Sequence, residues 1–146
     1  MNKFLVIHGP NLNLLGQREP HIYGSQTLEQ INQAITKKAA ELGVEVRVVQ
    51  YSSEGDIIDE IHRAKAWASG IVINAGAYTH YSIAIRDALS GVNLPAVEVH
   101  LSNTYAREEF RHKSMISPVV KGVIAGLGPR GYLYALDFLA NLAAGN

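Results

Sequence analysis

Arg18 and Tyr23 lie five residues apart in the segment 9–24, which follows a short apolar run and carries a glycine on each side of the pair. A phenol can remove a proton at neutral pH when a neighbouring cation lowers its pKa from the ordinary value of about 10, and Arg18 could supply that cation. A connection of this length is typical of a binding loop or lid, and the glycines would let it move as a flap. The same residues also fit a surface loop with a packed tyrosine and a solvated arginine.

A second chemical pair is Glu98 and His100, two positions apart in the apolar run 96–100. Because side chains alternate along a strand, both project to the same face. A carboxylate between Val97 and Val99 is costly to bury unless it has a partner. The pair therefore fits either a histidine general acid that Glu98 orients and charges, or a buried polar pair without a catalytic part.

Further polar groups follow this run. Arg107 and Arg111 would share one face of a helical turn at 106–112, where they could bind an oxygen-rich ligand, or they could pair with Glu108 and Glu109 at the surface. There is no cysteine, and no histidine pair has the spacing of a zinc helix, so we expect no metal site. A phenol, imidazoles, arginines and asparagines suit acid-base chemistry on a small, anionic, hydroxylated molecule.

Residues 126–131 match the spacing G-x-G-x-x-G between a strand and a helix. A dinucleotide site also needs a following strand and an acidic residue about 20 positions on, and the residues after Gly131 provide neither. We therefore expect these glycines to let the last helix pack closely on the sheet. A weak anion site in this loop is the alternative.

The composition indicates one ordinary domain, residues 1–146, with 47% hydrophobic residues. Thirteen basic residues balance thirteen acidic ones, which argues against a nucleic-acid or anionic-membrane partner. The absence of cysteine fits a reducing compartment, and the first residues lack the pattern of a signal peptide. These features predict a cytoplasmic protein.

Apolar strands and amphipathic helices alternate along the chain. Strands are expected at 4–7, 44–51, 71–73, 96–100 and 120–125, and helices from Thr27 to Gly43, from Ser53 to Ala68, at 82–89 and at 131–143. This pattern predicts an α/β, flavodoxin-like, doubly wound sheet of five parallel strands in the order 2-1-3-4-5, with helices on both faces. Such sheets bind ligands at the carboxyl ends of their strands, where the polar residues of this sequence gather.

The sequence resembles the type II 3-dehydroquinate dehydratases over essentially its whole length. The motifs that carry the resemblance are Gly9-Pro10-Asn11-Leu12-Asn13, Gly16-x-Arg18-Glu19-Pro20-x-x-Tyr23-Gly24, Asn74-Ala75-Gly76-x-x-Thr79-His80, Glu98-Val99-His100-x-Ser102-Asn103 and Arg107-Glu108-x-Phe110-Arg111. One position departs from the family pattern, because His8 stands where asparagine is more common.

The resemblance implies dehydration of 3-dehydroquinate to 3-dehydroshikimate on the route to chorismate and the aromatic amino acids. Quinate catabolism uses the same reaction. It implies anti elimination through an enolate, without a Schiff base or cofactor. Tyr23 would be the base, with its pKa lowered by Arg18. His100, held by Glu98, would protonate the departing hydroxyl, and Asn11 would stabilise the enolate, through water.

The resemblance also assigns substrate contacts. Leu101 and Ser102 would hold the carboxylate, while Asn74, His80 and Arg111 would bind ring hydroxyls.

Two further expectations concern closure of the site and assembly. Arg107 would help to close the site. The resemblance implies a dodecamer, a tetramer of trimers, in which Asp87 matches a residue that reaches a neighbouring subunit's site. Exposed-looking apolar residues such as Trp67 give this assembly indirect support.

The alternatives from another class are a flavin- or phosphate-binding module of the same fold, a signalling receiver, and an inactive relative kept as an assembly partner. A receiver would need a cluster of acidic residues at the sheet rim, and strand one ends without one.

Overall fold

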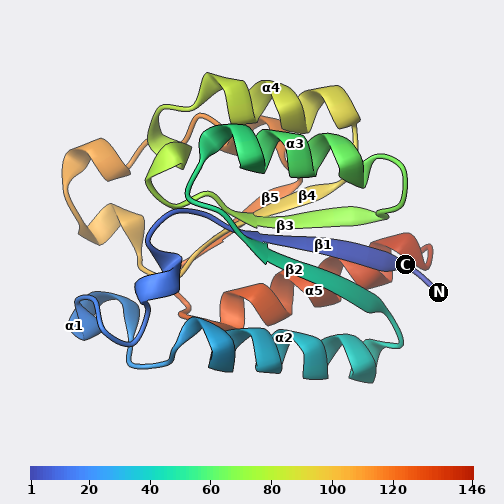
Figure 1. Cartoon of the computed structure of the whole chain (residues 1–146), viewed down its shortest axis with the longest axis horizontal. Helices are drawn as coiled ribbons and strands as arrows, with labels where there is room; N and C mark the ends of the chain where they lie inside the picture. Colours follow the sequence, from blue (N-terminus) through green and yellow to red (C-terminus); the bar gives the residue numbers. More distant parts are fainter.

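The computed structural model describes residues 1–146 and forms one parallel sheet with the strand order β2-β1-β3-β4-β5 (Figure 1). The strands are β1 (Lys3–His8), β2 (Glu45–Gln50), β3 (Gly70–Asn74), β4 (Ala96–His100) and β5 (Gly122–Ala125). All four neighbouring pairs run parallel. The predicted fold class and strand order are therefore confirmed.

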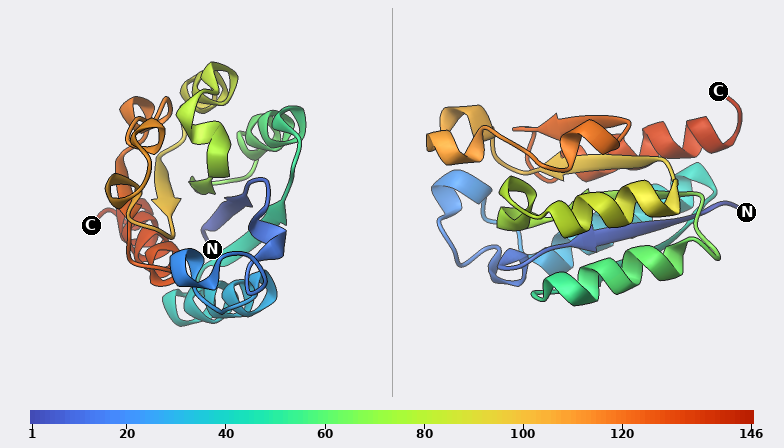
Figure 2. Two further views of the ribbon diagram at one scale, coloured as in Figure 1. Left: turned by 90° about the vertical axis from the view of Figure 1, so that its left-hand side faces the viewer. Right: turned by 90° about the horizontal axis from the view of Figure 1, so that it is seen from above.

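Helices cover both faces of this sheet. In Figures 1 and 2, α2 (Leu28–Leu42) and α5 (Arg130–Ala143) lie on one face, and α3 (Glu54–Ala64) and α4 (Ile83–Val92) lie on the other. The predicted starts of α2 and α3 are confirmed, because Thr27 and Gln30 form a reciprocal capping box and the Ser53 side chain accepts from the Asp56 N–H. None of the helices is long and apolar enough to cross a membrane.

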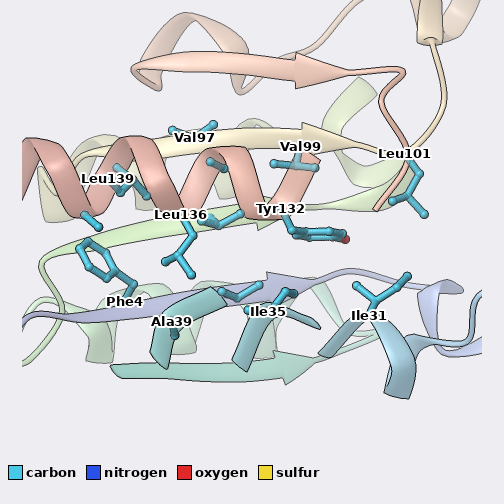
Figure 3. Packing of buried hydrophobic residues seen from close by; sticks show 14 of the residues in the cluster. Phe4, Ile31, Ile35, Ala39, Val97, Val99, Leu101, Tyr132, Leu136 and Leu139 are labelled. Atoms are coloured by element: carbon cyan, nitrogen blue, oxygen red, sulfur yellow. The ribbon is translucent and has the colours of Figure 1, made fainter. Parts of the chain in front are cut away.

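The strands divide their side chains between two cores. Phe4 and Val6 face the core under α2 and α5, while Leu5 and Ile7 face the core under α3 and α4. Figure 3 shows Ile31, Ile35 and Ala39 of α2 beside Leu136 and Leu139 of α5 on the same face of the sheet. Both faces are thus covered, which is why β3 and β4 are buried at every position.

Some predicted boundaries were wrong. β5 begins at Gly122 rather than at 120, because Ser117–Val119 form a 3₁₀ turn around Pro118. α3 ends at Ala64, so Ala68 lies beyond it. Trp67 is not exposed as expected, since it is half-buried against the core under α3 and α4.

The largest correction concerns the segment after β4. Instead of a helical turn at 106–112, the chain forms two 3₁₀ turns, Thr104–Ala106 and Glu109–Arg111, with Arg107 in extended conformation between them. Arg107 and Arg111 therefore share no helix face, although both side chains still reach the pocket described below.

The connection after β1 contains a 3₁₀ turn (Leu12–Leu14) and the short helix α1 (Pro20–Tyr23), neither of which the sequence patterns predicted. Asn11 and Glu19 adopt left-handed backbone conformations at the starts of these two elements. In Figures 1 and 2, α1 lies beyond the carboxyl ends of the strands, near the segment that follows β4. The two long connections thus enclose one end of the sheet.

Candidate active site

A pocket opens at the carboxyl ends of β1, β3 and β4, between the two long connections. Of the twelve predicted site residues, all but Glu98 and Asp87 line it, namely Asn11, Arg18, Tyr23, Asn74, His80, His100, Leu101, Ser102, Arg107 and Arg111. The sheet topology explains this convergence, because parallel strands bring their carboxyl ends to one edge. No lysine lines the pocket.

Two arginines flank Tyr23, the last residue of α1. The Arg18 guanidinium carbon lies 4.7 Å from the centre of the Tyr23 ring. Arg107 Nη1 donates to the Tyr23 hydroxyl oxygen at 2.8 Å, and the Arg107 guanidinium carbon lies 5.1 Å from the same ring. Sequence reasoning had assigned only Arg18 to this tyrosine, whereas the structure places Arg107 at the oxygen itself.

Glu98 and His100 lie on β4 and project to the same face, as predicted. His100 Nε2 is hydrogen-bonded to Glu98 Oε2, and the Glu98 side chain is fully buried. Because the ring nitrogen Nε2 is bonded to this carboxylate, Nδ1 is the nitrogen left for a ligand in the pocket. Glu98 therefore fixes which edge of the imidazole can act.

Three hydroxyl groups also hold the Glu98 carboxylate. Thr79 Oγ1 donates to it at 2.6 Å, Ser117 Oγ at 2.5 Å and Ser114 Oγ at 2.9 Å. Burial raises the pKa of Glu98, but the hydrogen bonds and charge of His100, together with the bonds from Ser117 and Thr79, hold the pKa below its ordinary value. The carboxylate is thus the favoured form despite complete burial.

His80 lies beside His100, with the two rings stacked at a centroid distance of 6.5 Å. Since the Lys113 carbonyl can only accept, His80 Nδ1–H donates to it, at 2.8 Å. Burial lowers the pKa of His80, and the nearby charges of His100 and Arg111 act in the same direction. The neutral ring leaves Nε2 as an acceptor for a hydroxyl group.

Behind Asn74 the structure holds a buried polar network. Asn74 Nδ2 donates to the Tyr132 hydroxyl at 3.0 Å, which in turn lies 2.9 Å from His8 Nδ1, and His8 Nε2 lies 2.8 Å from Asn32 Oδ1. Burial lowers the pKa of His8 to about 4, against the raising effect of the Asn32 hydrogen bond, and burial raises the pKa of Tyr132. Both groups are therefore uncharged at neutral pH.

The chain after His100 offers backbone donors to the pocket. The N–H groups of Leu101 and Ser102 donate to no acceptor within the chain. In contrast, Gly126 and Gly128 use their N–H groups for the carbonyls of His100 and Leu101, at 3.3 and 3.0 Å. The loop with the G-x-G-x-x-G spacing thus supports the end of β4, and these two donors are not free for an anion.

The last glycine of that motif acts as predicted. A Cβ atom on Gly131 would lie 3.2 Å from Val99 and 3.3 Å from Ile124, so a side chain would push α5 away from the sheet. The interpretation as close helix packing is therefore confirmed for Gly131 but not for Gly126 and Gly128, which instead adopt positive φ angles in the turn before α5.

The sequence left open whether Arg107 and Arg111 pair with neighbouring glutamates or face a ligand site, and the structure shows that they do both. The Glu108 carboxylate lies 3.2 Å from Arg111 Nε and 3.7 Å from Arg107 Nε, yet both arginine side chains are less than a fifth exposed and line the pocket. Asp87 lies on the exposed face of α4 and does not line this pocket.

Sequence reasoning missed the three hydroxyl groups that hold Glu98 and the Tyr132 hydroxyl behind Asn74. Thr79 belongs to the motif Asn74-Ala75-Gly76-x-x-Thr79-His80, so the sequence carried a signal for it. Ser114, Ser117 and Tyr132 carried no local signal, because each meets its partner only through the tertiary fold. No three His, Cys, Asp or Glu side chains gather as a metal-binding group.

The chain is similar to known proteins over almost its full length. The profile of the family described as dehydroquinase class II matches residues 2–140. A 3-dehydroquinate dehydratase of Halothermothrix orenii is 57% identical over 142 residues, which cover 97% of this chain and 96% of the relative. The crystal structure of type II dehydroquinase from Butyrivibrio crossotus has a TM-score of 0.93 and 50% identity, over 94% of this chain and 97% of that chain. The type II dehydroquinase from Propionibacterium acnes gives the same TM-score at 47% identity, over 97% of both chains.

Proposed function

The chain belongs to the class II dehydroquinase family and catalyses the dehydration of 3-dehydroquinate in the shikimate pathway, and from this premise we propose how its residues carry out the reaction. Tyr23 removes the proton next to the ketone, an enolate forms, and His100 protonates the hydroxyl that leaves from the opposite face. One observation carries this proposal: a phenol with two arginines and an imidazole with a carboxylate line the same pocket.

Tyr23 acts as the base in its phenolate form. Arg107 donates to the oxygen that would hold the negative charge, and the Arg18 guanidinium lies over the ring. Positive charge at both places favours an anion in a partly buried site. The proton can then pass from substrate carbon to Tyr23 oxygen without a metal.

His100 is the acid in this scheme. Its Nε2 stays on Glu98, so the proton leaves from Nδ1 toward the departing hydroxyl. The buried Glu98 carboxylate stabilises the imidazolium before transfer and keeps the ring oriented.

The remaining pocket residues bind the substrate. Asn11, whose carboxamide has no partner within the chain, stabilises the enolate through water. The free N–H groups of Leu101 and Ser102 bind the substrate carboxylate. Neutral His80 accepts from a ring hydroxyl, and Asn74 and Arg111 complete that hydroxyl site.

The reaction proceeds without a Schiff base. That route needs a lysine amine beside the ketone, and the lining of the pocket contains none. Proton transfer by Tyr23 and His100 accounts for the chemistry without a cofactor.

The test is ultraviolet absorbance after 3-dehydroquinate is added to the purified protein, which reports the conjugated enone of the product. Tyr23→Phe should form no enone while binding substrate with an affinity close to that of the wild type, because only the reacting oxygen is lost. Tyr134→Phe, which removes a half-exposed hydroxyl on α5, is the matched control. Full turnover by Tyr23→Phe would remove Tyr23 as the base.

We propose a dodecamer, a tetramer of trimers, in which Asp87 reaches a neighbouring subunit's pocket. Support comes from the exposed side of α4, where Asp87 lies one helical turn after the exposed Ile83. Exposed apolar residues on β5 and α5 supply a second surface, namely Val123, Phe138 and Leu142. Light scattering should give the mass of twelve chains, and a stable active monomer would contradict the assembly.

We also propose that residues 1–146 form a single catalytic domain and that the protein works in the cytoplasm. All the proposed catalytic residues lie at one end of a single continuous sheet, either on β4 or in the connection after β1. The absence of cysteine suits a reducing compartment. Fractionation of cells with an antibody to the protein would test the location.

A further inference from the structure

Four hydrogen bonds in series connect the pocket to helix α2. Gly76 N–H donates to Asn74 Oδ1 at 3.1 Å, and Asn74 Nδ2 donates to the Tyr132 hydroxyl. The Tyr132 hydroxyl meets His8 Nδ1, and His8 Nε2 meets Asn32 Oδ1. Gly76 and Asn74 line the pocket, whereas Tyr132 and His8 lie behind it and are almost fully buried.

The direction of every hydrogen bond in this series follows from donor and acceptor rules. A backbone N–H can only donate, so the oxygen of the Asn74 carboxamide faces Gly76 and its NH₂ group faces Tyr132. At the other end Asn32 Oδ1 can only accept, so His8 carries its proton on Nε2 and Nδ1 accepts from the Tyr132 hydroxyl. The Tyr132 oxygen thus accepts from Asn74 and donates to His8.

Burial fixes this order of donors and acceptors, because the buried groups cannot exchange their hydrogen bonds for bonds to water. The Tyr132 side chain is 1% exposed, and its ring packs edge-on against His8 at 4.9 Å. Figure 3 shows the Tyr132 ring between α5 and the sheet, with its oxygen toward the carboxyl ends of the strands. Water has little access to the hydroxyl, so loss of its acceptor at His8 would leave a buried donor unpaired.

We propose that Tyr132 and His8 are positioning residues that hold the Asn74 carboxamide in one orientation, with the second hydrogen of its NH₂ group available to a substrate hydroxyl. This inference rests on the proposed function, in which Asn74 binds such a hydroxyl. Neither Tyr132 nor His8 touches the substrate. Reversal of the Asn74 amide would turn the donor offered to the substrate into an acceptor and would set two N–H groups against each other at Gly76.

The chemistry of residue 8 supports this role. The oxygen Oδ1 of an asparagine lies where Nδ1 of a histidine lies, so either residue can accept from the Tyr132 hydroxyl. His8 adds a bond to Asn32 from its far nitrogen. The essential property of position 8 is therefore an acceptor toward Tyr132, not an imidazole.

Steady-state kinetics of the full-length protein with 3-dehydroquinate test the proposal. Tyr132→Phe and His8→Leu should each raise KM about tenfold, the effect of one hydrogen bond, and change kcat less than about twofold, because Asn74 binds the substrate without joining the proton transfers. His8→Asn should restore KM to near the wild-type value. Tyr134→Phe on the same helix is the control.

Two kinetic results would overturn the proposal: a wild-type KM for Tyr132→Phe, or a KM for His8→Asn as high as that for His8→Leu. An active wild type with either result would refute the positioning role alone. No enone from the wild type would refute the proposed function instead.

A measurement independent of activity covers the case in which a variant fails to fold. ¹⁵N chemical shifts of the histidine rings in the wild-type protein at pH 7 distinguish the two neutral tautomers. His8→Asn identifies the His8 signals. A His8 ring with its proton on Nε2 supports the ordered series, and a proton on Nδ1 overturns it.

Discussion

Arg107 Nη1 donates to the hydroxyl oxygen of Tyr23 at 2.8 Å, across 84 positions of the chain. The two residues come from the two long connections at the carboxyl end of the sheet. Arg107 also lies 3.4 Å from Ser102 Oγ, so one guanidinium links the proposed base to the proposed carboxylate site. We therefore expect Arg107 to act in catalysis as well as in closure of the site.

Replacement of Arg107 by glutamine should lower kcat about a hundredfold, since a charged donor to the reacting oxygen is lost. The kcat of Arg107→Lys should fall between those of the wild type and Arg107→Gln, because lysine keeps the positive charge but lacks the planar set of donors. Enone formation under saturating substrate measures the effect. Arg130→Gln, at an exposed position outside the pocket, should retain wild-type kcat. Unchanged kcat in Arg107→Gln would contradict a role at the phenol oxygen.

The second prediction concerns Glu98 and the pH dependence of stability. The folded state holds the pKa of Glu98 below its ordinary value of 4.5, so its carboxylate stabilises the fold above about that pH. This contribution is lost as pH falls through the folded-state pKa. Glu98→Gln should lower the free energy of unfolding by about 2 kcal/mol at pH 7, because an NH₂ group then faces hydroxyl donors.

Urea denaturation at several pH values tests this. The difference between wild type and Glu98→Gln should shrink as pH falls below about 4.5. Glu45→Gln, which removes an exposed partner of Lys3, should change stability little at any pH. A difference that grows toward low pH would reverse the sign we expect and refute the explanation.

Much of the fold could be predicted because its determinants are local. The apolar runs marked four of the five strands closely, and Thr27 with Gln30 marked the start of α2 through contacts within one turn. The two 3₁₀ turns around Arg107 could not be predicted in this way. They follow β4 in a polar segment whose conformation depends on contacts with the opposite connection, including the bond to Tyr23.

In the candidate site, too, the residues that could be predicted are joined by local spacing, and those that could not are joined only by the tertiary fold. Glu98 and His100 could be paired from their spacing, because alternation along a strand is a short-range rule. Ser114 and Ser117, which hold Glu98, lie 16 and 19 positions away, before and at the start of the 3₁₀ turn Ser117–Val119, and no periodicity connects them to β4. The network behind Asn74 was equally hidden, since Tyr132 lies 58 positions from Asn74 and 124 positions from His8 in the sequence.

The third prediction concerns the absence of a Schiff base. Sodium borohydride added together with 3-dehydroquinate should leave activity unchanged, because no lysine amine lines the pocket to form a reducible imine. Residual activity after dialysis measures this, and mass spectrometry should find no substrate adduct. Loss of activity with an adduct on any lysine would contradict the enolate route.

The last prediction concerns Gly9, where the loop after β1 crosses the end of β3. A Cβ atom at Gly9 would lie 2.6 Å from both the carbonyl carbon and the oxygen of Ala75, and backbone atoms cannot yield as a flexible side chain can. Gly9→Ala should therefore lower the free energy of unfolding by about 2 kcal/mol, the usual effect of overpacking. It should also lower activity, because Asn11 follows Gly9 in the loop after β1, Asn74 directly precedes Ala75 at the end of β3, and these two segments would be forced apart.

Gly91 provides the matched control for that substitution. It lies in α4, a Cβ there would meet no atom within 4 Å, and alanine is the better helix former. Gly91→Ala should be at least as stable as the wild type, so the same change of one methyl group should act in opposite directions at the two sites. Equal stability of Gly9→Ala and wild type in urea would mean that the two loops can separate without loss. In that case close packing at Gly9 could not be what brings Asn11 and Asn74 into one pocket.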